Sequence, residues 1–166
     1  MPRLFLAVPV RLEAYDALKA RFAPYLKGHW SEADQLHMTL AFLGERYSAA
    51  DIISRLESVD MHFEPAPVDR LGYFAANRIF HAGADTPSLK ALSGRIADAL
   101  ELRDYHFTPH VTLMRVKELR DETRFMQLLG TCRGEALGTM ETQTLLYEST
   151  LSQEGARYRR LKAWPA

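Results

Sequence analysis

Two histidines of this chain stand in the same four-residue setting. His37 begins His-Met-Thr-Leu and His110 begins His-Val-Thr-Leu. The chain has six histidines, and its composition alone predicts roughly 0.4 occurrences of His-x-Thr, of which about a quarter would continue with an aliphatic residue. Two copies that both continue with Leu are therefore a specific signal. A third His-x-Thr, at His106, is followed by Pro109 and carries no such weight.

The spacing has a chemical meaning if each motif lies on a β-strand. Side chains alternate between the two faces of a strand, so His37 and Thr39 share one face. His110 and Thr112 do the same on theirs. Two imidazoles and two hydroxyls match the needs of metal-independent phosphodiester hydrolysis, because one His takes a proton from water while the other protonates the departing alkoxide. The Thr hydroxyls would donate to the phosphate oxygens.

Arg115, three residues beyond Thr112, is the candidate substrate-binding cation. A guanidinium pairs with phosphate through two hydrogen bonds and neutralises developing charge. Strict alternation places it on the face opposite Thr112, so it reaches the site only through a twist, a bulge or a strand end. A solvated strand-end charge is an equal alternative. We interpret the other histidines as structural or surface residues: His29, His62, His81 and His106.

The elements that must position these residues are repeated along the chain. Residues 3–7 (RLFLA) resemble residues 78–82 (RIFHA), Leu18–Leu26 resembles Leu92–Leu100, and the two His motifs follow, with offsets that drift from 75 to 74 to 73. We infer two strand–helix–strand units related by a pseudo-twofold axis, which would bring both histidines to one cleft. Periodicity predicts strands at 3–8, 36–43, 78–82, 110–116, 142–151 and 158–163, and helices at 11–26, 49–59, 87–100 and 121–129.

Composition narrows the class of protein. The chain has 21 basic and 21 acidic residues, so a broad basic surface for nucleic acid is unfavoured, although a local positive cleft is compatible. The single cysteine, Cys132, cannot form an intrachain disulfide, which fits a reducing cytoplasm. No apolar run is long enough to span a membrane. Metal-ligand motifs, serine-hydrolase motifs and phosphate-binding Gly-rich loops are also absent from the sequence, and we expect no cofactor.

The motifs and their surroundings resemble the 2H phosphoesterase superfamily, and within it the bacterial RNA 2′,3′-cyclic phosphodiesterases. The resemblance lies in residues 3–7, 36–44, 107–113 with Arg115, 146–149 and 157–158. It implies one α+β domain over residues 1–166, with two pseudo-symmetric lobes, antiparallel sheets lining a central cleft and helices outside. It also implies roles: His37 as proton donor, His110 as proton acceptor, Thr39 and Thr112 holding the phosphate, and Arg115 assisting.

The substrate implied by the resemblance is an RNA end or a nucleotide that carries a 2′,3′-cyclic phosphate, opened to a 2′-phosphomonoester by a monomer without metal. Two alternatives stay open. The same residues would run the reverse reaction in a 2′-5′ RNA ligase, or the histidines would only grip phosphate in a non-catalytic module that binds RNA ends. For Phe42, Tyr147 and Trp30 we favour core packing over stacking on a base.

Overall fold

A computed structural model describes residues 3–103, 105–153 and 155–165. The described helices are α1 (Tyr15–Phe22), the short η1 (Ala33–Gln35), α2 (Ala49–Leu56), α3 (Pro87–Ala99) and α4 (Glu122–Thr131). The described strands are β1 (Arg3–Leu12), β2 (Leu26–Trp30), β3 (His37–Gly44), β4 (Pro67–Val68), β5 (Arg70–Phe74), β6 (Ile79–Gly83), β7 (His110–Leu119), β8 (Gly138–Met140), β9 (Thr144–Ser152) and β10 (Gly155–Trp164). The fold is α+β, as expected, with antiparallel pairing between the described strands.

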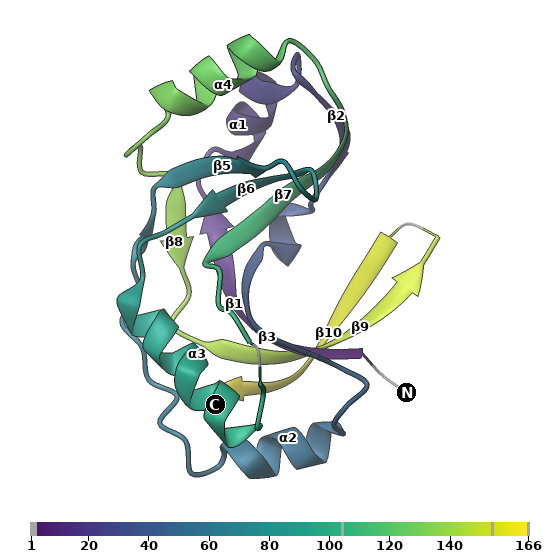
Figure 1. Ribbon diagram of the computed structural model, residues 1–166. Coiled ribbons are helices and arrows are strands. Elements are labelled where there is room, and N and C mark those ends of the chain that lie inside the picture. Colours follow the sequence, from purple (N-terminus) through teal and green to yellow (C-terminus); the bar gives the residue numbers. More distant parts are fainter. Residues whose placement is uncertain (1–2, 104, 154, 166) are drawn as a thin grey trace.

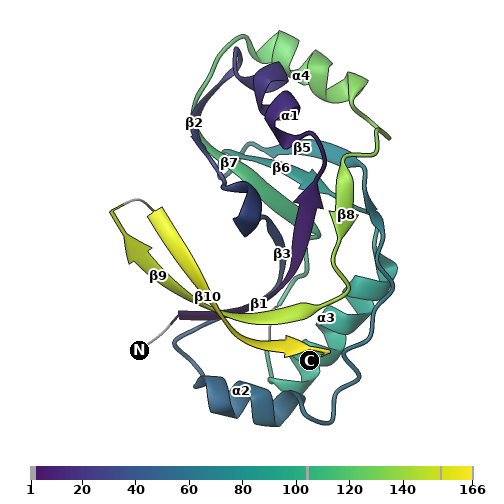
Figure 2. The ribbon, with the colours of Figure 1, turned by 180° about the vertical axis from the view of Figure 1, so that it is seen from behind.

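The strands form one curved sheet in the order β10-β9-β1-β3-β7-β6-β5, and β2 adds to β7. Figure 1 shows that this sheet bends into two lobes, one with β1, β3, β9 and β10 and the other with β2, β5, β6 and β7. Helices α2 and α3 lie outside the first lobe, and α1 and α4 lie outside the second (Figures 1 and 2). The β9–β10 hairpin extends away from both lobes and forms an arm.

The two lobes meet at the motifs themselves. Met38 of β3 and Val111 of β7 are backbone partners in an antiparallel pair, and each is the second residue of its His-x-Thr-Leu motif. An antiparallel pair has a local twofold axis between its two residues, perpendicular to the sheet. This axis relates His37 to His110 and Thr39 to Thr112, which is the arrangement that the repeat predicted.

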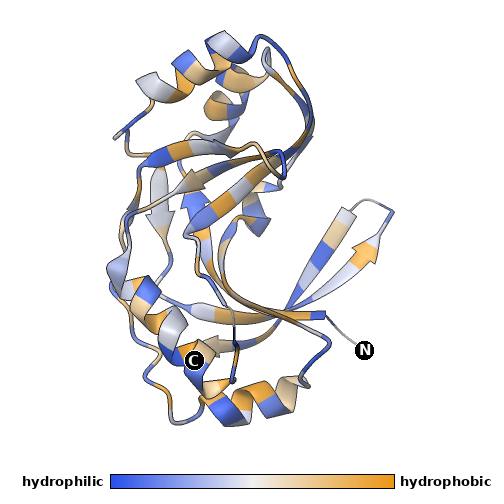
Figure 3. Ribbon diagram, viewed as in Figure 1, coloured by the Kyte–Doolittle hydropathy of each residue, from blue (hydrophilic) through white to orange (hydrophobic). Residues whose placement is uncertain are grey.

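The core follows from alternation along the strands, which Figure 3 shows as alternating apolar and polar bands. On β1, Leu4, Leu6 and Val8 are buried in the main core, whereas Phe5 and Ala7 face a small separate cluster with Leu145 and Tyr147. In the second lobe, three phenylalanine rings pack together beneath the helices, with centroid distances of 4.8–5.9 Å: Phe22, Phe80 and Phe125.

Three of the predicted helices lie close to their expected positions. Helix α3 begins at Pro87 after Thr86, whose side chain accepts from the Leu89 N–H, so the helix has both a first-turn proline and a capping hydroxyl. The predicted helix 11–26 is wrong at both ends. Leu12 belongs to β1 and Leu26 to β2, because their backbones pair with neighbouring strands. No described helix combines the length and the apolar character that a membrane crossing requires.

Candidate active site

One cleft between the lobes holds every candidate residue of the sequence analysis. It has a volume of about 890 Å³ and is lined by His37, Thr39, His110, Thr112 and Arg115. Its other walls come from β1, β2, η1, β3, β6 and the β9–β10 arm, through residues that include Phe5, His29, Ser31, Glu32, Asp34, Phe42, Ile79, Arg157 and Tyr158. The two halves of the repeat therefore contribute to a single site.

Both candidate histidines are held by the same backbone contact. The Nδ1–H of His37 donates to the carbonyl oxygen of Gln35 at 2.7 Å, and the Nδ1–H of His110 donates to that of Thr108 at 2.9 Å. In each case the acceptor lies two residues before the histidine. This contact fixes the Nδ1–H tautomer and leaves Nε2 as the nitrogen that can exchange a proton in the cleft.

The strand register sets the spacing of the pair. Because Met38 pairs with Val111, His37 lies diagonally across from His110, and it lies beside Thr112. In a regular antiparallel sheet such diagonal neighbours are about 7–8 Å apart at Cα and somewhat closer at Cβ. The charge of His110 also lowers the pKa of His37, which agrees with two rings that share one space. The register thus places both rings on one face of the sheet, diagonally across the β3–β7 pair.

A matched pair of β-bulges brings Arg115 onto the cleft face. In β3, Ala7 pairs with Thr39 but Leu6 pairs with Ala41, so β3 has one extra residue. In β7, His81 pairs with Thr112 but Phe80 pairs with Met114, which gives the same extra residue at the same place. The bulge reverses the alternation beyond it. Strict alternation therefore predicted the wrong face for Arg115, which is exposed and lines the cleft.

The bulge in β3 turns Phe42 to the cleft face, as the bulge in β7 does for Arg115. Phe42 is 55% exposed and lines the cleft, so the core packing expected for it is wrong. The guanidinium of Arg3 lies 5.5 Å from its ring centroid. The expected core packing is confirmed for Tyr147, which is buried. It is also confirmed for Trp30, which packs on the core against Tyr15 and Phe80.

The bulges also correct the alignment of the first repeated strand. The pairing partners show that Phe5 corresponds to Ile79 and Ala7 to His81, an offset of 74, whereas the sequence comparison had matched Phe5 to Phe80. The side chains agree with this, since Phe5 and Ile79 both line the cleft while Phe80 is fully buried in the core.

An aromatic cluster surrounds His37 in the first lobe. The ring centroids of Phe5, Tyr158 and Tyr147 lie 5.2, 5.3 and 6.3 Å from that of His37. Burial here lowers the pKa of His37 from its ordinary value of 6.5, the Gln35 carbonyl opposes the shift, and His110 adds to it. The neutral form of the His37 imidazole is therefore favoured.

His110 has a different neighbourhood. Its ring contacts Phe74 edge-to-face at 5.4 Å and His81 edge-to-face at 5.9 Å. Sequence reasoning missed His81, which lies on β6 directly across from Thr112. Burial lowers the pKa of His81 to about 4, with a further contribution from His110, so its ring is uncharged at neutral pH. No sequence signal singles out His81, because it belongs to no motif and its equivalent in the first repeat is Ala7.

Charges of both signs line the cleft. Arg115 and Arg157 contribute guanidinium groups, and Glu32 and Asp34, in and beside η1, contribute carboxylates. Burial raises the pKa of Tyr158, and the nearby charge of Arg115 opposes the rise, which places the cation close to the phenol of the arm. Within the described ranges, no three His, Cys, Asp or Glu side chains are grouped as metal ligands.

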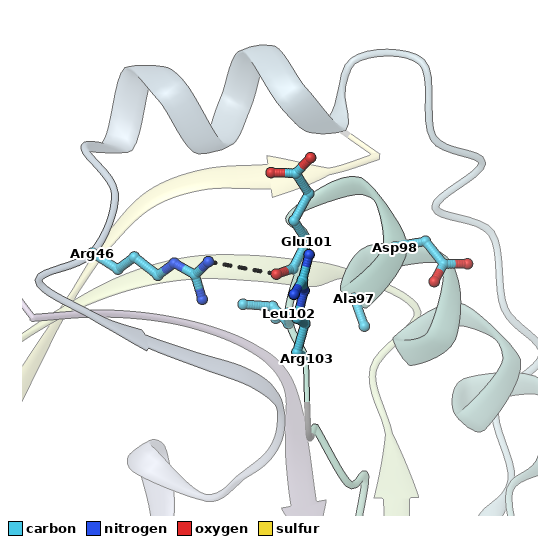
Figure 4. A pocket seen from close by; sticks show the side chains of 6 residues that line it. All are labelled: Arg46, Ala97, Asp98, Glu101, Leu102 and Arg103. Atoms are coloured by element: carbon cyan, nitrogen blue, oxygen red, sulfur yellow. Dashed lines mark hydrogen bonds between the residues drawn. The ribbon is translucent and has the colours of Figure 1, made fainter.

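A second hollow lies outside the cleft, at the C-terminal end of α3, and Figure 4 shows its lining. Its volume is about 570 Å³, and its charged side chains are Arg46, Asp98, Glu101 and Arg103. Arg46 donates to the backbone oxygen of Glu101 at 3.5 Å. The lining contains no histidine or nucleophile, so the chemistry of the molecule is concentrated in the cleft between the lobes.

Comparison with known proteins agrees with this arrangement. The family model of the 2′-5′ RNA ligase superfamily matches residues 8–144. An RNA 2′,3′-cyclic phosphodiesterase of Methanocaldococcus jannaschii is 25% identical, over 98% of this chain and 99% of its own length. One of Aquifex aeolicus is 26% identical, over 88% of this chain and 86% of its own length.

Solved structures show the same fold. Escherichia coli LigT complexed with 3′-AMP superposes with a TM-score of 0.70 at 26% identity, over 98% of this chain and 96% of that one. LigT complexed with NADP+ gives a TM-score of 0.69 at 25% identity, over 99% and 98%. The protein TT0787 of Thermus thermophilus shares the fold, with a TM-score of 0.69 at 23% identity, over 97% and 96%.

Proposed function

The chain belongs to the 2′-5′ RNA ligase superfamily, and we propose that it is a phosphoesterase that opens 2′,3′-cyclic phosphates on RNA ends or nucleotides to give 2′-phosphomonoesters. The superfamily and the relatives named RNA 2′,3′-cyclic phosphodiesterase support phosphoesterase activity. The observation that carries the finer proposal is the pair of histidines with identical backbone anchors, whose Nε2 atoms are left for one cleft.

In the proposed reaction His110 is the general base and His37 the general acid. Nε2 of His110 takes a proton from water, and the water oxygen forms a bond to phosphorus. The bond from phosphorus to the 3′ oxygen breaks, and Nε2 of His37 gives its proton to that oxygen. The product carries a 2′-phosphate and a 3′-hydroxyl. The assignment of acid and base comes from the resemblance, since both rings have the same tautomer.

The acid role requires a charged His37, whereas burial in the protein favours its neutral form. A bound cyclic phosphate carries one negative charge and would replace lost hydration with an ion pair, which raises the pKa of the imidazole. We therefore propose that substrate binding itself charges His37. In this account, binding of the anionic substrate protonates His37, and His37 then gives that proton to the departing 3′ oxygen.

Thr39 and Thr112 are proposed to donate to the two non-bridging phosphate oxygens, because each lies two residues beyond its histidine on the cleft face. Arg115 would neutralise the charge that builds up on those oxygens as water attacks. On the other lobe, exposed Phe42 offers a flat surface on which a nucleobase can stack. LigT has been solved in complex with 3′-AMP and with NADP+, which supports nucleotides as the class of ligand proposed for this chain.

The decisive experiment identifies the product of a 2′,3′-cyclic nucleotide, and of an RNA with a cyclic-phosphate end, incubated with the protein and EDTA. We expect a 2′-phosphate, with activity unaffected by the chelator. His37→Gln and His110→Gln should each abolish the reaction, whereas His62→Gln, at an exposed histidine paired with Glu64, should not. A 3′-phosphate would show that the leaving group is wrongly assigned, and full activity in either cleft variant would refute the mechanism.

The same experiment separates the alternatives. Adding an RNA with a 5′-hydroxyl end tests for 2′-5′ joining, which the same two histidines would catalyse in reverse. Water is in great excess in dilute solution, so we expect hydrolysis to dominate. Tight binding of the cyclic-phosphate end with no turnover would instead support a module that only binds RNA ends.

A further inference from the structure

A third histidine stands beside the proposed pair. His81 lies on β6, opposite Thr112 of β7, and its side chain is on the cleft side of the sheet, behind that of His110. It does not line the cleft itself. Its ring stacks on Phe74 at 3.9 Å with an interplanar angle of 28°, and it meets the His110 ring at 5.9 Å and 76°. The rings of Phe74, His81 and His110 thus all contact one another.

The backbone of β5 next to His81 has a glycine where any side chain would contact the imidazole ring. Gly72 of β5 pairs with His81, and a Cβ at Gly72 would lie 2.7 Å from Cε1 and 2.9 Å from Nε2 of the imidazole. Such contacts are far below van der Waals distance, so only glycine lets the ring lie flat across β5. The orientation of His81 is therefore set by Gly72 on one side and Phe74 on the other.

His81 offers its described neighbours a planar ring and no hydrogen bond from its buried Nδ1. Nδ1 of His81 is buried, and among the described residues no group lies in hydrogen-bonding geometry with it, although the nearby backbone of Ala82 opposes the lowering of the pKa of the ring. A phenylalanine ring would fill similar space without burying an unpartnered nitrogen. The equivalent residue of the first lobe is Ala7, so the third imidazole also breaks the pseudo-symmetry between the two halves of the site.

We propose that His81 is a positioning residue for His110: its uncharged ring, held by Gly72 and Phe74, fixes the plane of the His110 imidazole and presents an aromatic neighbour to the charge that His110 acquires from water. The inference rests on the proposed function, in which His110 is the general base. Phe74 and His81 lie perpendicular to the His110 ring, with centroids 5.4 and 5.9 Å away, and uncharged aromatic rings at this distance favour a neighbouring cation when they offer it their faces. A charged ring in the same place would repel it.

The low pKa of His81, about 4, agrees with this role because the ring remains uncharged wherever the reaction runs near neutral pH. The groups that face it are His110 from β7 and, further along β5, Arg70, which pairs with Gly83. Arg70 lies near two carboxylates, those of Asp69 and Asp85. His110 is therefore the neighbour whose charge matters to His81.

The test compares His81→Leu with His81→Phe, which both fill the space but differ in the planar ring. Steady-state hydrolysis of a 2′,3′-cyclic nucleotide should show kcat reduced at least tenfold in His81→Leu with KM within about twofold, and kcat retained in His81→Phe. Gly72→Ala, which displaces the ring without removing it, should behave like His81→Leu. Gly94→Ala, where an added Cβ meets nothing within 4 Å, is the matched control and should behave like the wild type.

A second readout does not depend on the substrate. Long-range ¹⁵N–¹H spectra of the imidazoles should show the Nδ1–H tautomer of His110 in the wild type and in His81→Phe, and a tautomer mixture in His81→Leu. Equal kcat and equal spectra in all variants would overturn the inference while leaving the proposed function intact. A wild-type protein without hydrolytic activity would instead refute the proposed function, and the spectra would still decide whether His81 orients His110.

Discussion

The half-buried imidazole of His81 should make the protein acid-labile in a defined pH window, and His81→Phe should remove that lability. The pKa of His81 is lowered from 6.5 to about 4 in the folded chain. As the pH falls from 6.5 to 4, the unfolded chain therefore binds a proton at this site that the folded chain does not, and the free energy of unfolding decreases. The difference between these two pKa values lowers the free energy of unfolding by at most about 3.4 kcal/mol. We expect about 2 kcal/mol, because the ring is only partly buried and water screens its charge.

The assay is urea or thermal unfolding of the wild type and His81→Phe at several pH values between 7.5 and 4. For a chain of 166 residues, about 2 kcal/mol corresponds to roughly 4–8 °C in Tm. His81→Phe should gain that advantage progressively below pH 6.5, since every carboxylate and every other histidine is common to both proteins. His62→Gln, at an exposed position, should show no such gain. Parallel loss of stability in wild type and His81→Phe would refute the reasoning.

Three further outcomes test the cleft. The His37 ring should titrate below pH 6.5 by NMR in the free protein, because burial disfavours its charge, and the midpoint should rise when inorganic phosphate is added; a midpoint that phosphate leaves unmoved would contradict substrate-induced protonation. Arg115→Met should lower kcat/KM by about 10–100-fold, as expected for loss of a charge-assisted hydrogen bond of about 1.5–3 kcal/mol, measured with a cyclic nucleotide. Phe42→Ala should raise KM by about 5–100-fold through lost stacking of about 1–3 kcal/mol; since the ring is exposed, calorimetry should show an almost unchanged Tm.

The sequence predicts the placement of the histidine pair better than that of its surroundings, for a local reason. Alternation along a strand is a property of consecutive residues, so His37 and Thr39 could be placed on one face without knowing the partner strand. A bulge depends on which residues two strands pair, and nothing within 110–116 shows it. The sequence alone could therefore not show which face of β7 carries Arg115. It indicated only that Arg115 would need a bulge, a twist or a strand end to reach the site.

The same distinction between local pattern and strand pairing explains where the predicted helices and strands differ from the structure. The apolar residues between Leu12 and Leu26 recur every three or four positions, but the first and last of them lie in strands on either side of α1. Four described strands lie outside the predicted ones, and each is short: β2, β4, β5 and β8. Of these, β2 and β8 also pair with residues far along the chain. His81 belongs to no motif and became visible only through its contact with His110.

The backbone pair of Met38 and Val111 has a consequence for the stereochemistry at phosphorus. The symmetry of the transition state expected for cyclic-phosphate opening matches that of the pair: a dyad through phosphorus and the retained 2′ oxygen exchanges the attacking with the departing oxygen, and one non-bridging oxygen with the other. A phosphorus atom on the protein's own dyad would then meet His37 and His110 at opposed apical positions and a threonine at each non-bridging oxygen. In-line displacement would follow from how two copies of one strand pair, and the differences at Ala7 and His81 would decide only which histidine acts as base and which as acid.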